Sequence, residues 1–257
     1  MSETGTTRHV EQIMGLPVTL ALRGRHARSP EGLAAWHDVV ASLRDVDRMF
    51  STYRADSAVS RVRDGSLRLE HAPPELVEVL AIAEQARVAS DGAFDVQIPS
   101  PDGSRTLDPS GVVKGWAIER AAALLDHLEA TDTCLSAGGD MVCRTRVVGS
   151  TGWRIGIEDP RAPERVLAVL PIVDGAVATS GTAHRGQHIL DGRTGLVPRG
   201  VASVTVVTGS LTWADIDATA AFAHGPDAAG WLQTRPDRTG LVVWKDGTTT
   251  SVRTPAA

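Results

Sequence analysis

The chain has 257 residues, of which 42% are hydrophobic and 22% charged, and this composition excludes a disordered, collagenous or fibrous protein. Its length suits one domain, or two lobes that share a cleft, better than two large domains with separate cores. The net charge is -5 and the Lys and Arg residues are dispersed, so we expect no nucleic-acid partner.

The N-terminal residues carry no pattern typical of export or membrane insertion. Residues 1–10 are polar and are expected to be disordered, and no signal-peptide stretch, lipid-attachment Cys or apolar run of about 20 residues is present. These features predict a cytoplasmic protein that does not span a membrane, with the inner face of a membrane as a further place of action. Cys134 and Cys143 are too few for a disulfide framework and lack zinc-ligand spacing, so we interpret them as small strand residues.

The first part of the chain is predicted to contain one strand and two helices. Residues 12–22 have the pattern of a strand that Gly15 disturbs, which indicates a bulge or a close backbone approach. A helix is predicted to begin at Pro30 and to continue to about residue 49, because apolar residues recur at three- and four-residue steps. A second helix is predicted over residues 74–89, ending at the turn signal Ser90-Asp91-Gly92.

The second part mixes helices with short strands. Residues 98–110 lack periodicity and are expected to form a loop, followed by a helix over about 114–128. The later helix is predicted over 212–223, and a closing hairpin turns at Asp246-Gly247. Short strands are predicted over residues 134–142, 153–157, 166–173, 176–179, 187–190 and 201–207. Strands and segregated helices together predict an α+β fold.

Asp215 and Thr219 form the most informative pair of polar residues. Four positions apart on a predicted helix, they project from one face, and a carboxylate with a hydroxyl suits Mg²⁺. The alternative is a capping-box variant in which Thr212 caps the helix and Asp215 stabilises its first turn. Spacing alone favours this second interpretation.

Three further segments are ambiguous when taken singly. Lys114 follows a loop that opens into a helix, where free N–H groups favour an anion, although the local pattern alone favours a loop-to-helix transition with a solvated lysine. His188 is predicted near an Asp-Gly turn, where it could relay a proton or serve as a structural histidine. Residues 136–140 and 90–95 fit either tight turns or ligand loops.

In chain order, however, these segments form a recognisable series. The segments are Met14-Gly15, residues 50–57, 91–95, 108–117, 138–140, 179–181 and 188–195, and Ala214-Asp215 with Ala218-Thr219. Together they resemble the successive motifs of the ApbE-type FAD:protein FMN transferases over nearly the whole chain. The Asp-Gly-Ala-Phe-Asp, Lys-Gly and Ala-Asp…Ala-Thr blocks are specific as a set.

The resemblance implies one α+β domain over residues 1–257, with a T-fold-like arrangement of mixed sheets flanked by helices and two lobes around a flavin cleft. It implies an enzyme that binds FAD and Mg²⁺, joins FMN through a phosphoester to a Thr or Ser hydroxyl of an acceptor flavoprotein, and releases AMP. Its implied catalytic residues are His188, Asp215 and Lys114, with His188 assisting removal of the hydroxyl proton.

The resemblance also assigns contacts residue by residue. The implied FAD contacts are Met14, Tyr53, Ala93, Phe94, Asp95, Asp108, Lys114, His188 and Ile189, and the implied metal site comprises Gly111, Asp215, Ala218 and Thr219. At Gly111 and Ala218 only a backbone carbonyl could serve as a ligand.

This assignment gives the polar pair a chemical role. A Mg²⁺ held by Asp215 and Thr219 would neutralise charge on the diphosphate, and Lys114 would add to that effect. In a chain that is 4% aromatic, Tyr53 and Phe94 become candidates to stack on a ring of the flavin dinucleotide.

The chain departs from the family pattern in two places. The stretch between residues 95 and 108 is shorter than in many relatives, and Asp191-Gly192 replaces the usual Asp-Pro.

Two other functions remain open: an FAD pyrophosphatase that releases FMN and AMP, and a non-catalytic FAD-binding protein. The acceptor protein is not identified by the sequence.

Overall fold

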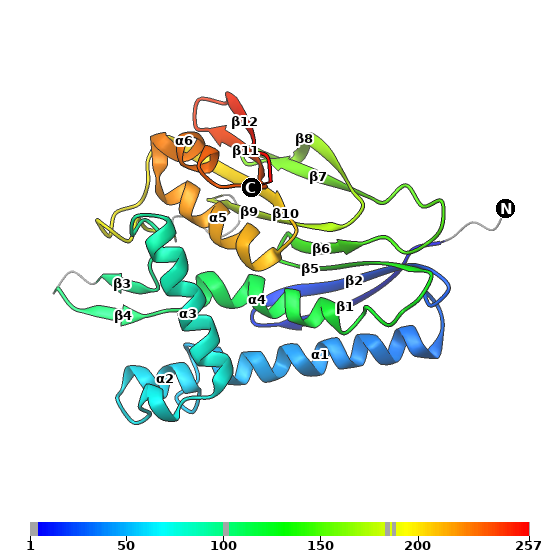
Figure 1. The fold of residues 1–257 in the computed structure, drawn as a ribbon, viewed down its shortest axis with the longest axis horizontal. Coiled ribbons are helices and arrows are strands. Elements are labelled where there is room, and N and C mark those ends of the chain that lie inside the picture. The colour runs from blue at the N-terminus through cyan, green and yellow to red at the C-terminus, as the bar shows by residue number, and fades with distance from the viewer. Residues whose placement is uncertain (1–4, 100–102, 183–185, 187–188, 257) are drawn as a thin grey trace.

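An eight-stranded sheet forms the centre of the protein (Figure 1), in a computed structural model that describes residues 5–99, 103–182, 186 and 189–256. Every neighbouring pair in this sheet is antiparallel. The strands in spatial order are β1 (Thr7–Ile13), β2 (Leu16–Gly24), β5 (Thr131–Ala137), β6 (Asp140–Arg144), β9 (Gly175–Gly181), β10 (Val201–Thr208), β11 (Thr239–Trp244) and β12 (Thr249–Arg253).

Helices and two hairpins complete the described fold. The helices are α1 (Pro30–Phe50), α2 (Ala58–Arg63), α3 (Pro74–Ala89), α4 (Ser110–Ala123), α5 (Leu211–Ala223) and α6 (Ala228–Gln233), with short 3-10 turns at Leu69–His71 and Gly225–Asp227. The hairpins pair β3 (Gln97–Pro99) with β4 (Arg105–Leu107), and β7 (Trp153–Asp159) with β8 (Ala162–Ile172). Within the described residues, no helix combines the length and the apolar composition needed to cross a membrane.

Strand alternation divides the core between the two faces of the sheet. Leu20 and Leu22 of β2 point into the large apolar cluster that the helices cover. Ala21, between them, points to the opposite face and packs in a smaller cluster with Trp153 and Ile172 of the β7–β8 hairpin. The helices therefore cover one face of the sheet, and this hairpin covers part of the other.

The two cysteines belong to this smaller cluster. Cys134 on β5 and Cys143 on β6 are cross-strand partners, and their Sγ atoms lie 3.6 Å apart as free, buried thiols. Burial and the neighbouring sulfur raise the pKa of the Cys143 thiol. Their prediction as small strand residues is confirmed.

The α+β class is confirmed, with corrections at the N-terminus and in the sheet. Thr7–Ile13 is a strand, so the disorder expected through residue 10 is wrong for this part; His9 stacks on Trp36 at a ring-centroid distance of 5.8 Å, which helps to hold β1 in place. The single strand predicted over residues 12–22 is a hairpin that turns at Met14-Gly15, where both φ angles are positive. The expected mixed sheets are corrected too, because all described pairs are antiparallel.

Other differences concern element boundaries. The helix predicted from about residue 114 begins at Ser110, because helical backbone follows directly after Pro109. The predicted loop over residues 98–110 contains parts of both strands of the β3–β4 hairpin. The sequence predicts a strand over residues 187–190. Residues 189–190 are not in a strand, and residues 187–188 lie outside the described residues.

Close packing between α4 and α5 aligns the two helices that carry the predicted polar residues. Gly115 of α4 faces the first turn of α5, and a Cβ built there would lie 2.9 Å from the carbonyl oxygen of Leu211 and 3.0 Å from the Cβ of Asp215. The missing side chain thus allows α4 to approach α5 closely. The other side of α5 is anchored through buried Asp217, which pairs with Arg235 and Arg238.

Substitution of Gly115 by Ala should separate these helices. The added methyl group meets backbone atoms that cannot turn away, so we expect a loss of about 1–3 kcal/mol in the free energy of unfolding. Chemical denaturation measures this loss. Gly209→Ala is the matched control, because a Cβ there has no neighbour within 4 Å; equal effects of the two substitutions would contradict the packing argument.

Candidate active site between helices α4 and α5

Two buried carboxylates share one lysine ammonium group at the α4–α5 contact. Lys114 Nζ lies 3.2 Å from Asp215 Oδ1 on α5 and forms a second ion pair with Asp140 Oδ2 on β6. The side chains of Asp140 and Asp215 are 1% and 3% exposed, whereas that of Lys114 is 21% exposed. The lysine therefore links the two helices to the sheet and retains a partly open side.

Burial strongly affects the charge of this cluster. Desolvation raises the pKa of Asp215 to about 7, opposed by Lys114 and reinforced by the negative charge of Asp140. The two carboxylates raise the pKa of Lys114 against the effect of its burial, so the ammonium group stays protonated. The cluster consequently holds a fixed positive charge beside a carboxyl group that titrates near neutral pH.

Hydroxyl groups from α5 and β9 lie next to the cluster. Thr219, four residues after Asp215 on α5, has its Oγ1 2.9 Å from Ser180 Oγ on β9. Asp140 Oδ1 accepts a hydrogen bond of 2.9 Å from the N–H of Thr179. Strand β9 thereby positions both the carboxylate of Asp140 and the hydroxyl of Thr219.

The capping interpretation of Asp215 is wrong. The helix cap is Ser210, whose side chain accepts the N–H of Trp213. Thr212 instead donates its hydroxyl to Glu119 of α4. Asp215 is thus free of any capping role and points toward Lys114.

The residues present suit a small divalent cation. Asp215 Oδ2 is buried and has no hydrogen-bond partner within the described part of the chain, and an unsatisfied carboxylate oxygen is a strong candidate ligand. The Thr219 hydroxyl adds a second oxygen. No cluster of three or more His, Cys, Asp or Glu ligands occurs among the described residues.

The two residues predicted to offer carbonyl ligands occupy different surroundings. Gly111 lies in the first turn of α4, where a Cβ would be 3.2 Å from the ring of Phe94. Ala218 is buried in the middle of α5. Their roles as metal ligands remain predictions.

Apart from Lys114 in α4, the described residues among the predicted FAD contacts lie in turns and loops. Met14 is in the β1–β2 turn with φ of 54°, and Tyr53 is 98% exposed, so its ring is free to stack on a ligand. Ala93 and Ile189 are buried. Phe94 is 4% exposed and packs in the core, and its stacking on a ring of the flavin dinucleotide stays a prediction.

Asp95 and Asp108 lie on either side of the β3–β4 hairpin. Asp95 pairs with Arg105 at 2.6 Å, and Asp108 accepts hydrogen bonds from the N–H and the hydroxyl of Ser110 at the start of α4. The assignment of both carboxylates to FAD binding stays a prediction. His188 lies outside the described residues, so its proposed proton transfer also stays a prediction.

Gly192 joins two of these turns. Its N–H donates to the carbonyl oxygen of Ala93 at 3.0 Å, and a Cβ at this position would lie 2.6 Å from the carbonyl oxygen of Gly92. Arg105 also donates to the carbonyl oxygen of Gly192 at 3.1 Å. The Asp-Gly departure from the family pattern therefore provides both an N–H donor and the space that this contact needs.

Asp140 is a site residue to which the sequence analysis gave no role. The sequence predicts a tight turn or a ligand loop for residues 136–140, and residues 138–140 belong to the series of family motifs, but no role is assigned to the Asp140 side chain. The available signal was a carboxylate at the start of a strand of largely apolar residues, because a carboxylate buried there needs a cationic partner. Lys114 supplies that partner from a distant part of the chain.

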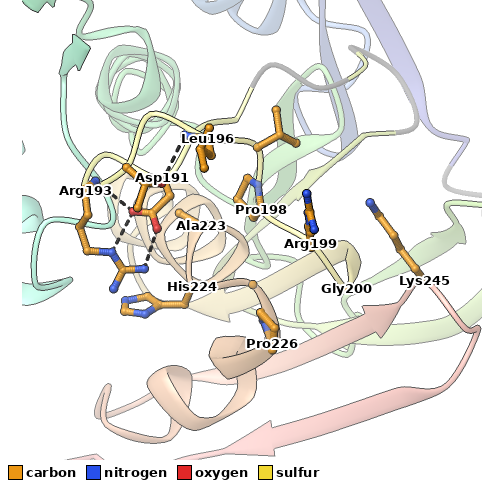
Figure 2. Close-up of a pocket in the computed structure, with 13 residues that line it drawn as sticks. Asp191, Arg193, Leu196, Pro198, Arg199, Gly200, Ala223, His224, Pro226 and Lys245 are labelled. Carbon is orange, nitrogen blue, oxygen red and sulfur yellow. Dashed lines mark hydrogen bonds and ion pairs between the residues drawn. The ribbon is translucent and has the colours of Figure 1, made fainter. Parts of the chain in front are cut away.

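A cavity of about 780 Å³ lies at the C-terminal end of α5 (Figure 2). Of the predicted metal ligands and FAD contacts that the structure describes, none lines it. The lining residues are Asp191, Arg193, Thr194, Leu196, Val197, Pro198, Arg199, Gly200, Ala223, His224, Gly225, Pro226 and Lys245.

The chain matches the family model described as the ApbE family over residues 14–102 and 98–242. Curated relatives include FAD:protein FMN transferases of Haemophilus influenzae, 24% identical over 88% of this chain and 80% of the relative, and of Escherichia coli K12, 24% identical over 78% and 74%.

Solved structures with the same fold include the ApbE protein of Thermotoga maritima, with a TM-score of 0.84 and 22% identity over 97% of both chains. The flavin transferase ApbE of Vibrio cholerae has a TM-score of 0.80 and 20% identity over 98% of this chain and 97% of that one. With the family model spanning most of the sequence, the chain belongs to the ApbE family, whose curated relatives matched here are transferase enzymes.

Proposed function

We propose that this protein is a Mg²⁺-dependent FAD:protein FMN transferase. The proposal is that it attaches FMN by a phosphoester bond to a Thr or Ser hydroxyl of an acceptor flavoprotein and releases AMP. The observation that carries it is the buried carboxylate oxygen of Asp215, which has no hydrogen-bond partner among the described residues and lies beside the ammonium of Lys114, with the hydroxyl-bearing Thr219 one helical turn away. The names of the curated relatives supply the reaction class.

The residues have complementary tasks in this reaction. The acceptor oxygen forms a bond to the phosphorus of the FMN part, the bond from that phosphorus to the oxygen of the AMP phosphate breaks, and the hydroxyl proton passes to a base, for which the resemblance implies His188. Lys114 provides positive charge for the phosphate oxygens, while Asp140 holds its Nζ in place. Asp215 and Thr219 would hold Mg²⁺, which when bound neutralises charge that develops on the diphosphate.

Asp215→Asn tests this assignment directly. The purified protein, FAD, Mg²⁺ and a coexpressed acceptor should yield a protein whose mass increases by FMN, seen also as flavin fluorescence in a denaturing gel. The amide is a poor cation ligand, so we expect a loss of transfer of at least about 100-fold, in line with the several kcal/mol that a metal ion contributes.

The matched control is Asp45→Asn, which changes an exposed carboxylate on α1 that is 64% exposed and pairs with Arg48. Unchanged transfer by Asp215→Asn would refute the metal assignment. Release of AMP at the same rate with and without an acceptor would favour an FAD pyrophosphatase, and FAD that stays intact would favour a non-catalytic binding protein.

The pH dependence of Mg²⁺ binding provides a second prediction. Burial raises the pKa of Asp215 to about 7, so below this pH the cation must displace a proton. We expect the Mg²⁺ affinity of the FAD complex, measured by calorimetry, to fall about tenfold per pH unit below 7 and to level off above it. Asp215→Asn should remove this dependence, and a flat profile in the unmodified protein would contradict it.

The raised pKa of Asp215 also affects the stability of the metal-free protein. An unfolded Asp titrates near a pKa of about 3.9, so between about pH 4 and 7 the folded state holds a proton that the unfolded state has lost. This group therefore lowers stability as pH rises through that interval. Mg²⁺ should stabilise the protein more at pH 8 than at pH 6, as a larger increase in Tm.

Asp140→Asn tests the role of the second carboxylate. Without the Asp140 carboxylate, Asp215 is the one remaining ion-pair partner of the Lys114 ammonium among the described residues. The lysine then competes more strongly with a cation for the Asp215 carboxylate. We expect Mg²⁺ affinity about tenfold weaker, with a smaller change in FAD affinity measured without metal. Asp174→Asn, which removes an exposed carboxylate paired with Arg146, is the control; equal Mg²⁺ affinity in the two variants would contradict the positioning role.

A further inference from the structure

The cavity at the end of α5 carries a local positive charge in a chain whose net charge is -5. Arg193 is neutralised by Asp191, its Nε and Nη2 lying 2.8 and 2.9 Å from the two carboxylate oxygens. Arg199 and Lys245 are both exposed, and neither side chain has an ion-pair partner in the described part of the protein. With Asp191 paired, these two residues give the lining a net charge of +2.

Backbone contacts fix the two cations close together. The N–H of Lys245 donates to the carbonyl oxygen of Gly200 at 2.8 Å, which places the end of β11 against the segment that carries Arg199. Figure 2 shows Arg199 and Lys245 at one end of the cavity and the Asp191–Arg193 pair at the other. The cations thus belong to one site, although they come from separate parts of the sequence.

Apart from its charged residues, the cavity is lined mostly by apolar side chains and glycine, and it is too large for a simple anion. Leu196 is 68% exposed, and Pro198, Pro226 and Ala223 also line the cavity. A volume of about 780 Å³ lies in the range of about 300–1,000 Å³ that is typical for ligands of the size of a short peptide or a drug. A cationic end with an apolar wall suits a peptide that carries carboxylates together with aliphatic side chains.

The cavity adjoins the candidate active site along the chain. Ala223 lies about one helical turn, or about 5.4 Å, beyond Thr219 on α5. Asp191 follows the predicted FAD contact Ile189 by two positions. A peptide extended at about 3.3 Å per residue would cover this helical turn with about two residues.

We propose that this cavity binds an acidic segment of the acceptor protein, with carboxylates at least about two residues from the hydroxyl that receives FMN. Arg199 and Lys245 pair with these carboxylates, and the wall around Leu196 covers an aliphatic side chain. The inference rests on the proposed function and adds the chemistry of the partner. Because the chain as a whole carries a net negative charge, attraction of an acidic segment is confined to the positively charged cavity.

Two fluorescein-labelled, N-acetylated peptides test this inference. Both contain a central Thr and one Leu, and two Asp residues of the first are replaced by Lys in the second. Fluorescence anisotropy with the FAD-loaded protein should show tighter binding of the Asp peptide. In the double variant Arg199→Glu, Lys245→Glu, we expect the affinity for this peptide to fall at least about tenfold and the preference to reverse.

Arg8→Glu is the control for the change in charge, because Arg8 is an exposed residue of β1, seven strands from β12 at the far edge of the sheet. It should keep the preference for the Asp peptide. FAD affinity and Tm of the double variant should match those of the unmodified protein, because neither substituted residue belongs to the α4–α5 cluster.

Carbodiimide coupling offers an independent readout. The chain has two lysines, and Lys114 is held by two carboxylates, so the Asp peptide should couple to Lys245, as identified by mass spectrometry. Equal binding of both peptides, a preference that survives in the double variant, or displacement of the peptide by millimolar inorganic phosphate would overturn the inference. FMN transfer without preference for acidic peptides would also overturn it and leave the proposed function intact, whereas absence of transfer to any acceptor would contradict the function itself.

Discussion

The ion pairs between one ammonium group and two buried carboxylates determine how this protein arranges its candidate site. Lys114 comes from a helix, Asp215 from a second helix and Asp140 from a strand, so the cluster requires all three elements in register. Two buried carboxylates without a cation would be strongly unfavourable. The cluster therefore favours the same α4–α5 approach that the absence of a side chain at Gly115 permits.

The same arrangement leaves one negative charge in excess when both carboxylates are ionised. Burial opposes this charge and raises the pKa of Asp215 to about 7, so the metal-free site is poised between a protonated and an ionised form. A divalent cation would relieve the excess, and the unpartnered Oδ2 of Asp215 is available to it. Because an ionised, buried carboxylate is unfavourable without a counter-charge, its burial favours binding of a cation at this site.

Sequence patterns predicted local features well and long-range contacts poorly. The i, i+4 relation of Asp215 and Thr219 follows from helical periodicity, and it holds in α5. The choice between a cap and a site residue could not be made from spacing, because it depends on Glu119 and Lys114 of another helix. The order of motifs along the chain, rather than any single spacing, indicated the family.

Other features depended on contacts that the sequence does not display. Residues 7–10 are polar, yet pairing with β2 and the stacking of His9 on Trp36 hold them in a strand. Phe94 was a candidate for stacking in a chain with few aromatics, but packing against the glycine at position 111 buries its ring. Asp140 had no predicted role because its partner is distant in sequence.

The position of the cationic cavity has a consequence for how a transferase of this kind would select a protein substrate. A hydroxyl group offers little to distinguish one Thr or Ser from another, so selectivity must come from residues that flank it. The cavity and the α4–α5 cluster share helix α5, so a segment held in the cavity has its position relative to Thr219 fixed by one rigid element. Recognition and chemistry would then be aligned by the helix itself, without any requirement for the two sites to contact each other.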